Sequence, residues 1–78
     1  MKKTLEYIVK SIVEKPDDVN VTENDENGVT EFVVTVDKDD MGKVIGKGGK
    51  VIRSIRNVMK IPAIKENKRI HITLSEES

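Results

Sequence analysis

The sequence predicts an α+β domain with the element order α-β-β-α-α-β, in which three helices cover one face of a three-stranded sheet. A chain of 78 residues has room for one domain with a small core. Val and Ile supply 20 of its 23 Leu, Ile, Val and Phe residues, and β-branched side chains favour strands. Apolar residues alternate in some segments and recur at helical spacing in others, so both kinds of element are expected.

The first element is predicted to be an amphipathic helix. Its apolar residues follow the spacing i, i+3, i+4, i+7, i+8, namely Leu5, Ile8, Val9, Ile12 and Val13. Thr4 is a suitable N-cap. Pro16 is expected to end the helix, because proline disfavours helical backbone in the residue before it.

A β-hairpin is predicted next, with strands at about 18–24 and 29–37. Apolar residues alternate with polar ones in both segments: Val19 and Val21, then Phe32, Val34 and Val36. Asn27-Gly28 between them is a strong turn signal. Val33 lies on the outward side of the second strand, so that strand is expected to be partly covered on both sides.

Two helices and a last strand complete the predicted fold. The first helix, about 40–46, is expected to be capped by Asp39 or Asp40 and to bury Met41, Val44 and Ile45. The second helix, about 49–60, has an apolar stripe and is expected to end at Pro62; the stripe consists of Val51, Ile52, Ile55, Val58 and Met59. A strand follows at about 68–74. The domain is expected to cover residues 2–75, and 76–78 would form a short polar tail.

The charges are balanced overall but separated along the chain. Residues 14–40 carry ten acidic and two basic side chains, a net charge of −8. Residues 41–69 carry nine basic side chains and one acidic, a net charge of +8. This asymmetry indicates an anionic partner for the second half, although charge runs are also common on solvated faces.

The composition excludes several classes of protein. Without cysteine there is no disulfide scaffold and no Cys-based metal or redox site, and a single histidine, His71, cannot form a zinc cluster. No apolar run approaches the roughly 18 residues of a membrane span, and no signal peptide is recognisable. We therefore expect a cytoplasmic protein with no membrane contact, no metal and no cofactor. No catalytic constellation surrounds His71, so an enzyme is the least favoured class.

The glycine-rich segment Gly46-Lys47-Gly48-Gly49 joins the two predicted helices. A tight turn of this kind needs glycine, and the helix that follows presents free N–H groups and the positive end of its dipole. Lys47 and Lys50 flank this end, so the segment suits a phosphodiester backbone. A nucleotide P-loop does not fit, because its spacing is one residue short and Gly48 stands where Ser or Thr is required. A plain helix–helix turn is the alternative.

The segment Val44-Ile45-Gly46-Lys47-Gly48-Gly49-Lys50-Val51-Ile52-Arg53-Ser54-Ile55 resembles the KH-domain signature, I-G-x-x-G-x-x-I-x-x-I. Gly46 and Gly49 match its G-x-x-G loop. The element order resembles the type II, prokaryotic KH arrangement over about residues 2–75. A free-standing domain of this size resembles the small bacterial KH proteins of the KhpA type.

The resemblance implies binding of single-stranded RNA, with the G-x-x-G loop clamping about four nucleotides. Phosphates would contact the loop residues Gly46, Lys47, Gly48 and Gly49 together with Lys43, Lys50 and Arg53. The floor of the base groove would be formed by Val44, Ile45, Val51 and Ile52, and its wall by Arg69, Ile70, His71 and Ile72. For His71, a surface or cross-strand position is the alternative to a base contact.

Resemblance to the KhpA type further implies an RNA chaperone or post-transcriptional regulator that acts as a homodimer or with a larger KhpB-like KH partner and influences cell shape and cell-wall homeostasis. A KH-fold dimerisation adaptor with little RNA binding is the alternative function. Tyr7 and Phe32, the two aromatic residues, lie far from the loop in sequence, so base stacking is scarce and phosphate contacts should dominate the affinity.

The segment Ile61-Pro62-Ala63-Ile64 follows the predicted helix and is unusually apolar for a loop. Proline has no N–H, so such a segment leaves fewer backbone groups that need water when it is buried. We expect Ile61, Pro62 and Ile64 to form a symmetric homodimer interface, although either isoleucine could instead close the core.

Overall fold

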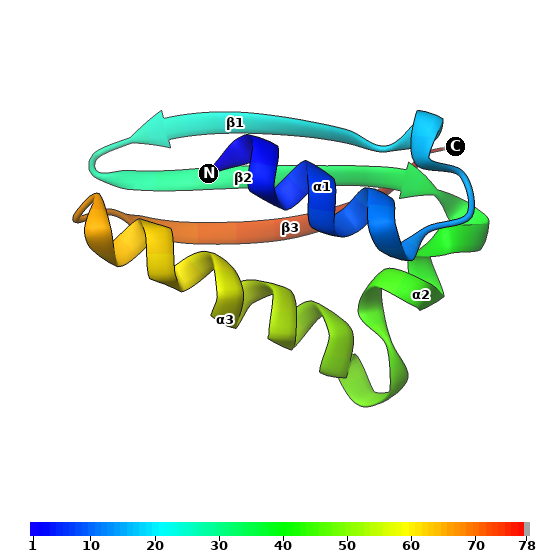
Figure 1. Cartoon of the computed structure of the whole chain (residues 1–78). Helices are drawn as coiled ribbons and strands as arrows, with labels where there is room; N and C mark the ends of the chain where they lie inside the picture. The colour runs from blue at the N-terminus through cyan, green and yellow to red at the C-terminus, as the bar shows by residue number, and fades with distance from the viewer. Residues whose placement is uncertain (78) are drawn as a thin grey trace.

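The computed structural model describes residues 1–77 and confirms the predicted order of helices and strands (Figure 1). Its elements are α1 (Lys2–Ile12), β1 (Asn20–Glu26), β2 (Val29–Asp37), α2 (Met41–Ile45), α3 (Lys50–Lys65) and β3 (Arg69–Glu77). Short 3₁₀ turns at Pro16–Asp18, Lys38–Asp40 and Lys47–Gly49 join them.

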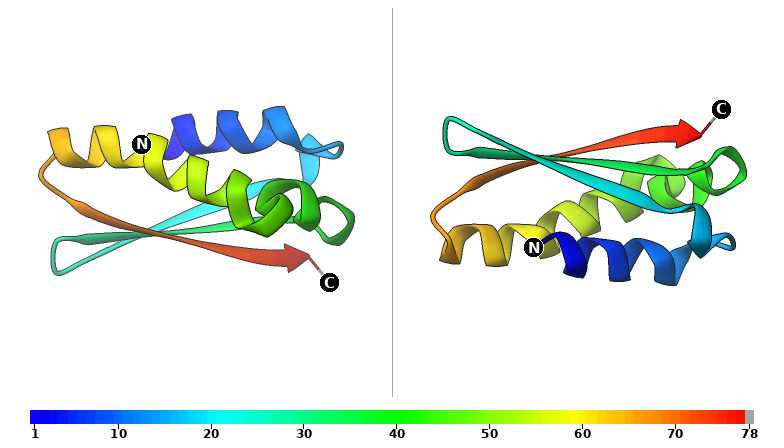
Figure 2. Two further views of the ribbon diagram at one scale, coloured as in Figure 1. Left: turned by 90° about the horizontal axis from the view of Figure 1, so that it is seen from below. Right: turned by 90° about the horizontal axis from the view of Figure 1, so that it is seen from above.

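The sheet has the strand order β1-β2-β3, with β2 in the centre. β1 is antiparallel to β2, and β3 is parallel to it. The turn between β1 and β2 is the predicted one, since Asn27 and Gly28 both have positive φ, 53° and 80°. The helices lie on one face of this sheet, as Figure 2 shows, and within residues 1–77 its other face carries no helix.

The core lies between the sheet and the helices. Alternate residues of β2 supply its centre, because successive side chains of a strand point to opposite faces. Its buried members are Leu5, Val9, Val21, Phe32, Val34, Val36, Val44, Ile52, Ile55, Met59 and Ile72. Val33, on the opposite face, is half-buried without a helix over it.

The predicted N-cap Thr4 is wrong, whereas Asp40 stands at the N-cap position of α2 as predicted but makes no cap hydrogen bond there. α1 begins at Lys2, where the Leu5 N–H donates to the Met1 carbonyl over 3.1 Å, so Thr4 lies inside the helix. Before α2, the buried Asp40 carboxylate accepts the backbone N–H groups of Glu14 and Lys15, both at 3.1 Å, instead of capping its own helix. A bond to another segment has therefore replaced the local cap.

The side chain that caps in this region is that of Asp37, the N-cap of the 3₁₀ turn before α2. Its carboxylate accepts the Asp39 N–H over 2.8 Å at the start of the 3₁₀ turn. This hydrogen bond, followed by the charge of Lys15, lowers the pKa of Asp37 below its ordinary value.

α3 is longer than predicted, because Pro62 lies inside it instead of ending it. Proline removes one helical hydrogen bond, but Ala63 in the same turn is buried, and the Lys68 N–H donates to the Ala63 carbonyl over 2.9 Å. The helix ends where Asn67 takes a positive φ of 56°. The segment Ile61–Ile64 is therefore helical, and the prediction of a loop there is wrong.

β3 is also longer than predicted. Its pairing with β2 continues to the register Asp37↔Glu77, so residues 76 and 77 of the predicted tail extend the strand. Ser78 lies outside the described residues. Over the part of the chain that the structure covers, no helix combines the length and hydropathy needed to cross a membrane.

Candidate nucleic-acid interface

The turn between α2 and α3 depends on Gly46. This residue has a φ of 76°, and its carbonyl accepts the Gly49 N–H over 3.2 Å. A Cβ at this position would lie 2.8 Å from the backbone nitrogen of Val51 and would overlap the Val51 side chain. Both the backbone conformation and the close approach of α3 therefore require glycine here.

Gly48 is exposed and Gly49 is half-buried, with open space beside both. Both have positive φ, 63° and 77°, and a Cβ on either would meet no atom within 4 Å. α3 begins directly after them at Lys50, and its N-cap Gly49 supplies no side-chain hydrogen bond to the first turn. The Gly49 and Lys50 N–H groups donate to the Gly46 and Lys47 carbonyls, so what the loop offers an anion is the positive end of the α3 dipole with no side chain capping it.

Basic side chains continue from this loop along α3. At 100° per residue, Arg53, Arg56 and Lys60 lie within about 60° of one another on the helix. All three are exposed, and no ion pair found within residues 1–77 involves them or Lys47 and Lys50. The three α3 residues form a basic row, and together with the two loop lysines they are available to an anion.

The row faces the outer edge of β3. Arg56 Nη2 donates to the Ile72 carbonyl over 3.2 Å, and Arg56 and Lys60 line a cavity of about 360 Å³ together with Ile70, His71 and Ile72. Arg56 and Lys60 were not among the site residues predicted from the sequence. Arg56 follows Arg53 by three residues and Lys60 follows Arg56 by four, and this helical spacing is the signal that could have identified them.

The structure only partly supports the predicted groove floor. Val44 is fully buried in the core and cannot contact a ligand, so its assignment is wrong. Ile52 is 8% exposed and is also mainly a core residue. Ile45 is 37% exposed, although we expected it on the buried side of α2, and Val51 is half-buried beside Gly46.

Residues 69–72 divide between the two faces of the sheet. Ile70 and Ile72 pack towards the helices. Arg69 and His71 alternate with them and belong to the open face, where His71 is exposed and in register with Glu31. His71 still lines the cavity, because β3 is an edge strand.

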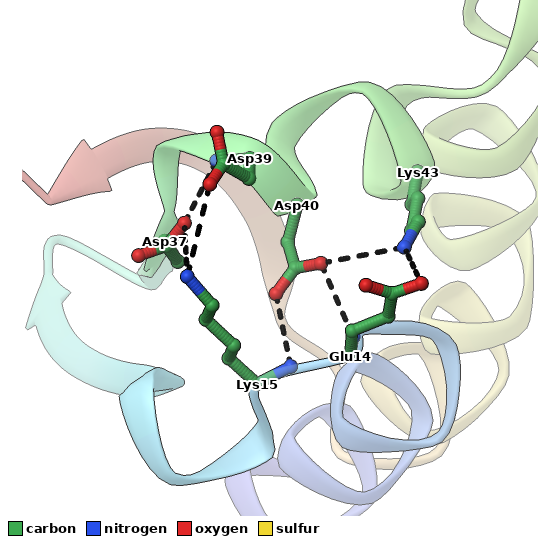
Figure 3. A network of polar contacts seen from close by, with 6 residues as sticks. All are labelled: Glu14, Lys15, Asp37, Asp39, Asp40 and Lys43. Carbon is green, nitrogen blue, oxygen red and sulfur yellow. Dashed lines mark hydrogen bonds and ion pairs between the residues drawn. The ribbon is translucent and has the colours of Figure 1, made fainter.

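Lys43 belongs to a polar network and not to the exposed basic row (Figure 3). Its ammonium group lies 2.6 Å from a Glu14 carboxylate oxygen and 3.8 Å from Asp40. Lys15 likewise pairs with Asp37 at 3.5 Å, an interaction that raises the pKa of Lys15. Since two carboxylates already compensate Lys43, it is the weakest of the predicted phosphate ligands.

A family model described as the KhpA/KhpB KH domain matches residues 2–74. The chain belongs to this family. It is 46% identical over 76 residues to the RNA-binding protein KhpA of Clostridium perfringens, an alignment that covers 95% of this chain and 99% of the relative. It is 38% identical over 77 residues to RNA-binding protein KhpA of Chlamydia trachomatis serovar D, with 99% of each chain covered.

Solved structures of Era share the fold. Era from Aquifex aeolicus bound to GDP·AlF₄⁻ matches with a TM-score of 0.67 and 15% identity, over 96% of this chain and 29% of Era. A structure of Era in complex with MgGDPNP and nucleotides of 16S ribosomal RNA gives a TM-score of 0.68. At this identity the likeness concerns the fold alone, and it confirms the predicted type II KH arrangement. The KH family is not a family of enzymes, which agrees with the prediction that the chain is not one.

Proposed function

We propose that the chain binds single-stranded RNA through the Gly46–Gly49 loop and the basic row of α3. The observation that carries this proposal is the loop itself: two open glycines precede a helix start that Lys47 and Lys50 flank, with no acidic partner for either lysine within residues 1–77. An anionic backbone can approach such a surface closely. The relatives' name, RNA-binding protein KhpA, supports the same function.

Phosphate contacts would supply most of the affinity. The two aromatic residues do not serve the site, since Phe32 is buried in the core and Tyr7 lies on α1. The groove beside Arg56 and Ile72 would receive unpaired bases, which favours single strands over duplexes.

The test compares one RNA sequence as a single strand and as a duplex, by fluorescence anisotropy. We expect the single strand to bind at least about tenfold more tightly, because the bases of a duplex cannot leave the stack and enter the groove. Equal affinity for both forms would contradict the proposal. No binding to either would favour the alternative, a KH-fold adaptor.

We also propose that the chain forms a homodimer through α3. Ile61 and Ile64 are 59% and 75% exposed, and at 100° per residue Ile61 lies about 160° away from the buried Met59. Ile61 and Ile64 form an exposed apolar stripe, with Pro62 between them in the sequence. Two copies of this stripe would pack across a two-fold axis. A dimer would set two RNA sites side by side and raise the effective concentration of each.

Membership of the KhpA/KhpB family supports a role as an RNA chaperone or post-transcriptional regulator in the cytoplasm, with a KhpB-like KH protein as partner and an influence on cell shape and cell-wall homeostasis. Sequencing of RNA crosslinked to the protein in cells would identify its targets. Co-purification from the same cells would test the partner, and a preparation that contains no second KH protein would contradict that part of the proposal.

A further inference from the structure

A second cavity lies at the far end of α3 from the glycine loop. It has a volume of about 320 Å³ and is lined by Lys60, Ala63 and Ile64 of α3 and by Lys68–His71 at the start of β3. It shares Lys60, Ile70 and His71 with the cavity beside Arg56. The two cavities are therefore adjoining parts of one cleft along the seam between α3 and β3.

The far cavity combines an apolar floor with a basic rim. Ala63 is buried, Ile70 is half-buried, and Ile64 forms an exposed apolar side, so a base in this cavity and the proposed dimer contact would compete for Ile64. Lys60, Lys68 and Arg69 surround them. A flat apolar ring attached to an anionic backbone has the complementary chemistry, and a nucleotide of single-stranded RNA is such a group.

We propose that an RNA strand held by the glycine loop continues along the cleft and places a further base in this far cavity, with Lys68 and Arg69 contacting its phosphates. This inference rests on the proposed RNA-binding function and extends it. It makes the site longer than the four nucleotides that a G-x-x-G loop clamps.

The basic groups at the far end are available to a phosphate. Lys68 Nζ lies 3.8 Å from the Asp25 carboxylate, and both side chains are more than a third exposed. Surface pairs of this kind contribute little, so a phosphate oxygen can compete with the aspartate. No ion pair found within residues 1–77 involves Lys60 or Arg69.

The experiment measures the affinities of a tetra- and an octauridylate for three proteins by fluorescence anisotropy. The test variant is Lys68→Glu/Arg69→Glu, and the matched control is Lys3→Glu/Lys10→Glu, which makes the same charge change on exposed positions of α1. The octamer's advantage is the ratio of the tetramer's dissociation constant to that of the octamer. We expect this ratio to be at least about fivefold smaller for the test variant than for the control. An advantage equal in the test variant and the control would overturn the inference.

Two further measurements remove ambiguity. Circular dichroism and urea unfolding check the fold, and Lys68→Gln/Arg69→Gln replaces the test variant if the glutamates impair folding. For crosslinking, 4-thiouridine is placed at one end of the octamer or at the other. One of these two RNAs should crosslink to residues 60–71, and crosslinks confined to residues 43–53 for both would overturn the inference. The Lys47→Asp/Gly48→Asp variant tests the proposed RNA-binding function separately. It should lose tetramer binding, and unchanged tetramer binding in this variant would contradict that function.

Discussion

The buried carboxylate of Asp40 accepts the backbone N–H of Lys15 over 3.1 Å and thereby ties the segment that follows α1 to the start of α2. Its other oxygen accepts the Glu14 N–H over the same distance. Because α2 leads directly into the glycine loop, this contact fixes the direction from which the chain enters the site.

Asp40→Ala should destabilise the fold by roughly 2–4 kcal/mol, because two backbone N–H groups lose a charged acceptor. The measurement is the free energy of unfolding in urea. Asp39→Ala is the matched control, since Asp39 is exposed and its pair with Lys15 at 3.7 Å should contribute at most about 1 kcal/mol. Equal stability of the two variants would show that Asp40 does not hold the two helices together.

Gly46→Ala should cost roughly 2–4 kcal/mol of stability, because the added Cβ meets the Val51 backbone and a positive φ is strained for alanine. Gly42→Ala is the control. Gly42 lies in α2 with no atom within 4 Å of a Cβ and no positive φ, so alanine there should be neutral or stabilising by up to about 1 kcal/mol. The two urea midpoints should therefore move in opposite directions or differ clearly; coincident midpoints would rule out the close contact.

Particular residues show how far the sequence predicts this molecule. Periodicity was enough to predict each element, and Asn27-Gly28 was enough to predict the hairpin, because these signals are local. Two of the predictions that failed involve partners distant in sequence. Asp40 bonds to segments about 25 positions away, and burial of Ala63 carries α3 past Pro62.

The candidate site shows the same difference between local signals, which the sequence reveals, and tertiary contacts, which it does not. The loop glycines and their φ values agree with the motif that predicted them. Exposure could not be predicted from the motif, which is why Val44 was placed in the groove although it is a core residue. The bond between Arg56 and Ile72 joins a helix to an edge strand, and only the tertiary structure brings those two residues together.

RNA affinity should fall steeply as salt rises. If three or four phosphates contact the loop, the helix start and the basic row, the plot of log K against log salt concentration should have a slope of roughly −2 to −3 for a single strand. Isothermal titrations at several salt concentrations give this slope. A slope near zero would mean that phosphate contacts do not carry the binding.

Ile61→Asp should give a folded monomer, because two carboxylates facing each other across the two-fold axis cannot be buried. Sedimentation at tens of micromolar reports the association state, and Tyr7→Asp is the control, since Tyr7 is also exposed but lies on α1. A wild type that sediments as a monomer, or an Ile61→Asp variant that remains a dimer, would exclude this interface.

The glycine loop as the RNA clamp is tested most directly by the affinity of Lys47→Asp/Gly48→Asp for single-stranded RNA. The two changes lower the charge of the loop by three units and leave Gly46, on which the turn depends, in place. We predict that the variant unfolds cooperatively in urea, as the wild type does, and that its binding falls at least about a hundredfold, because carboxylates would face the phosphates. A correctly folded variant that binds RNA within twofold of the wild type would contradict the account.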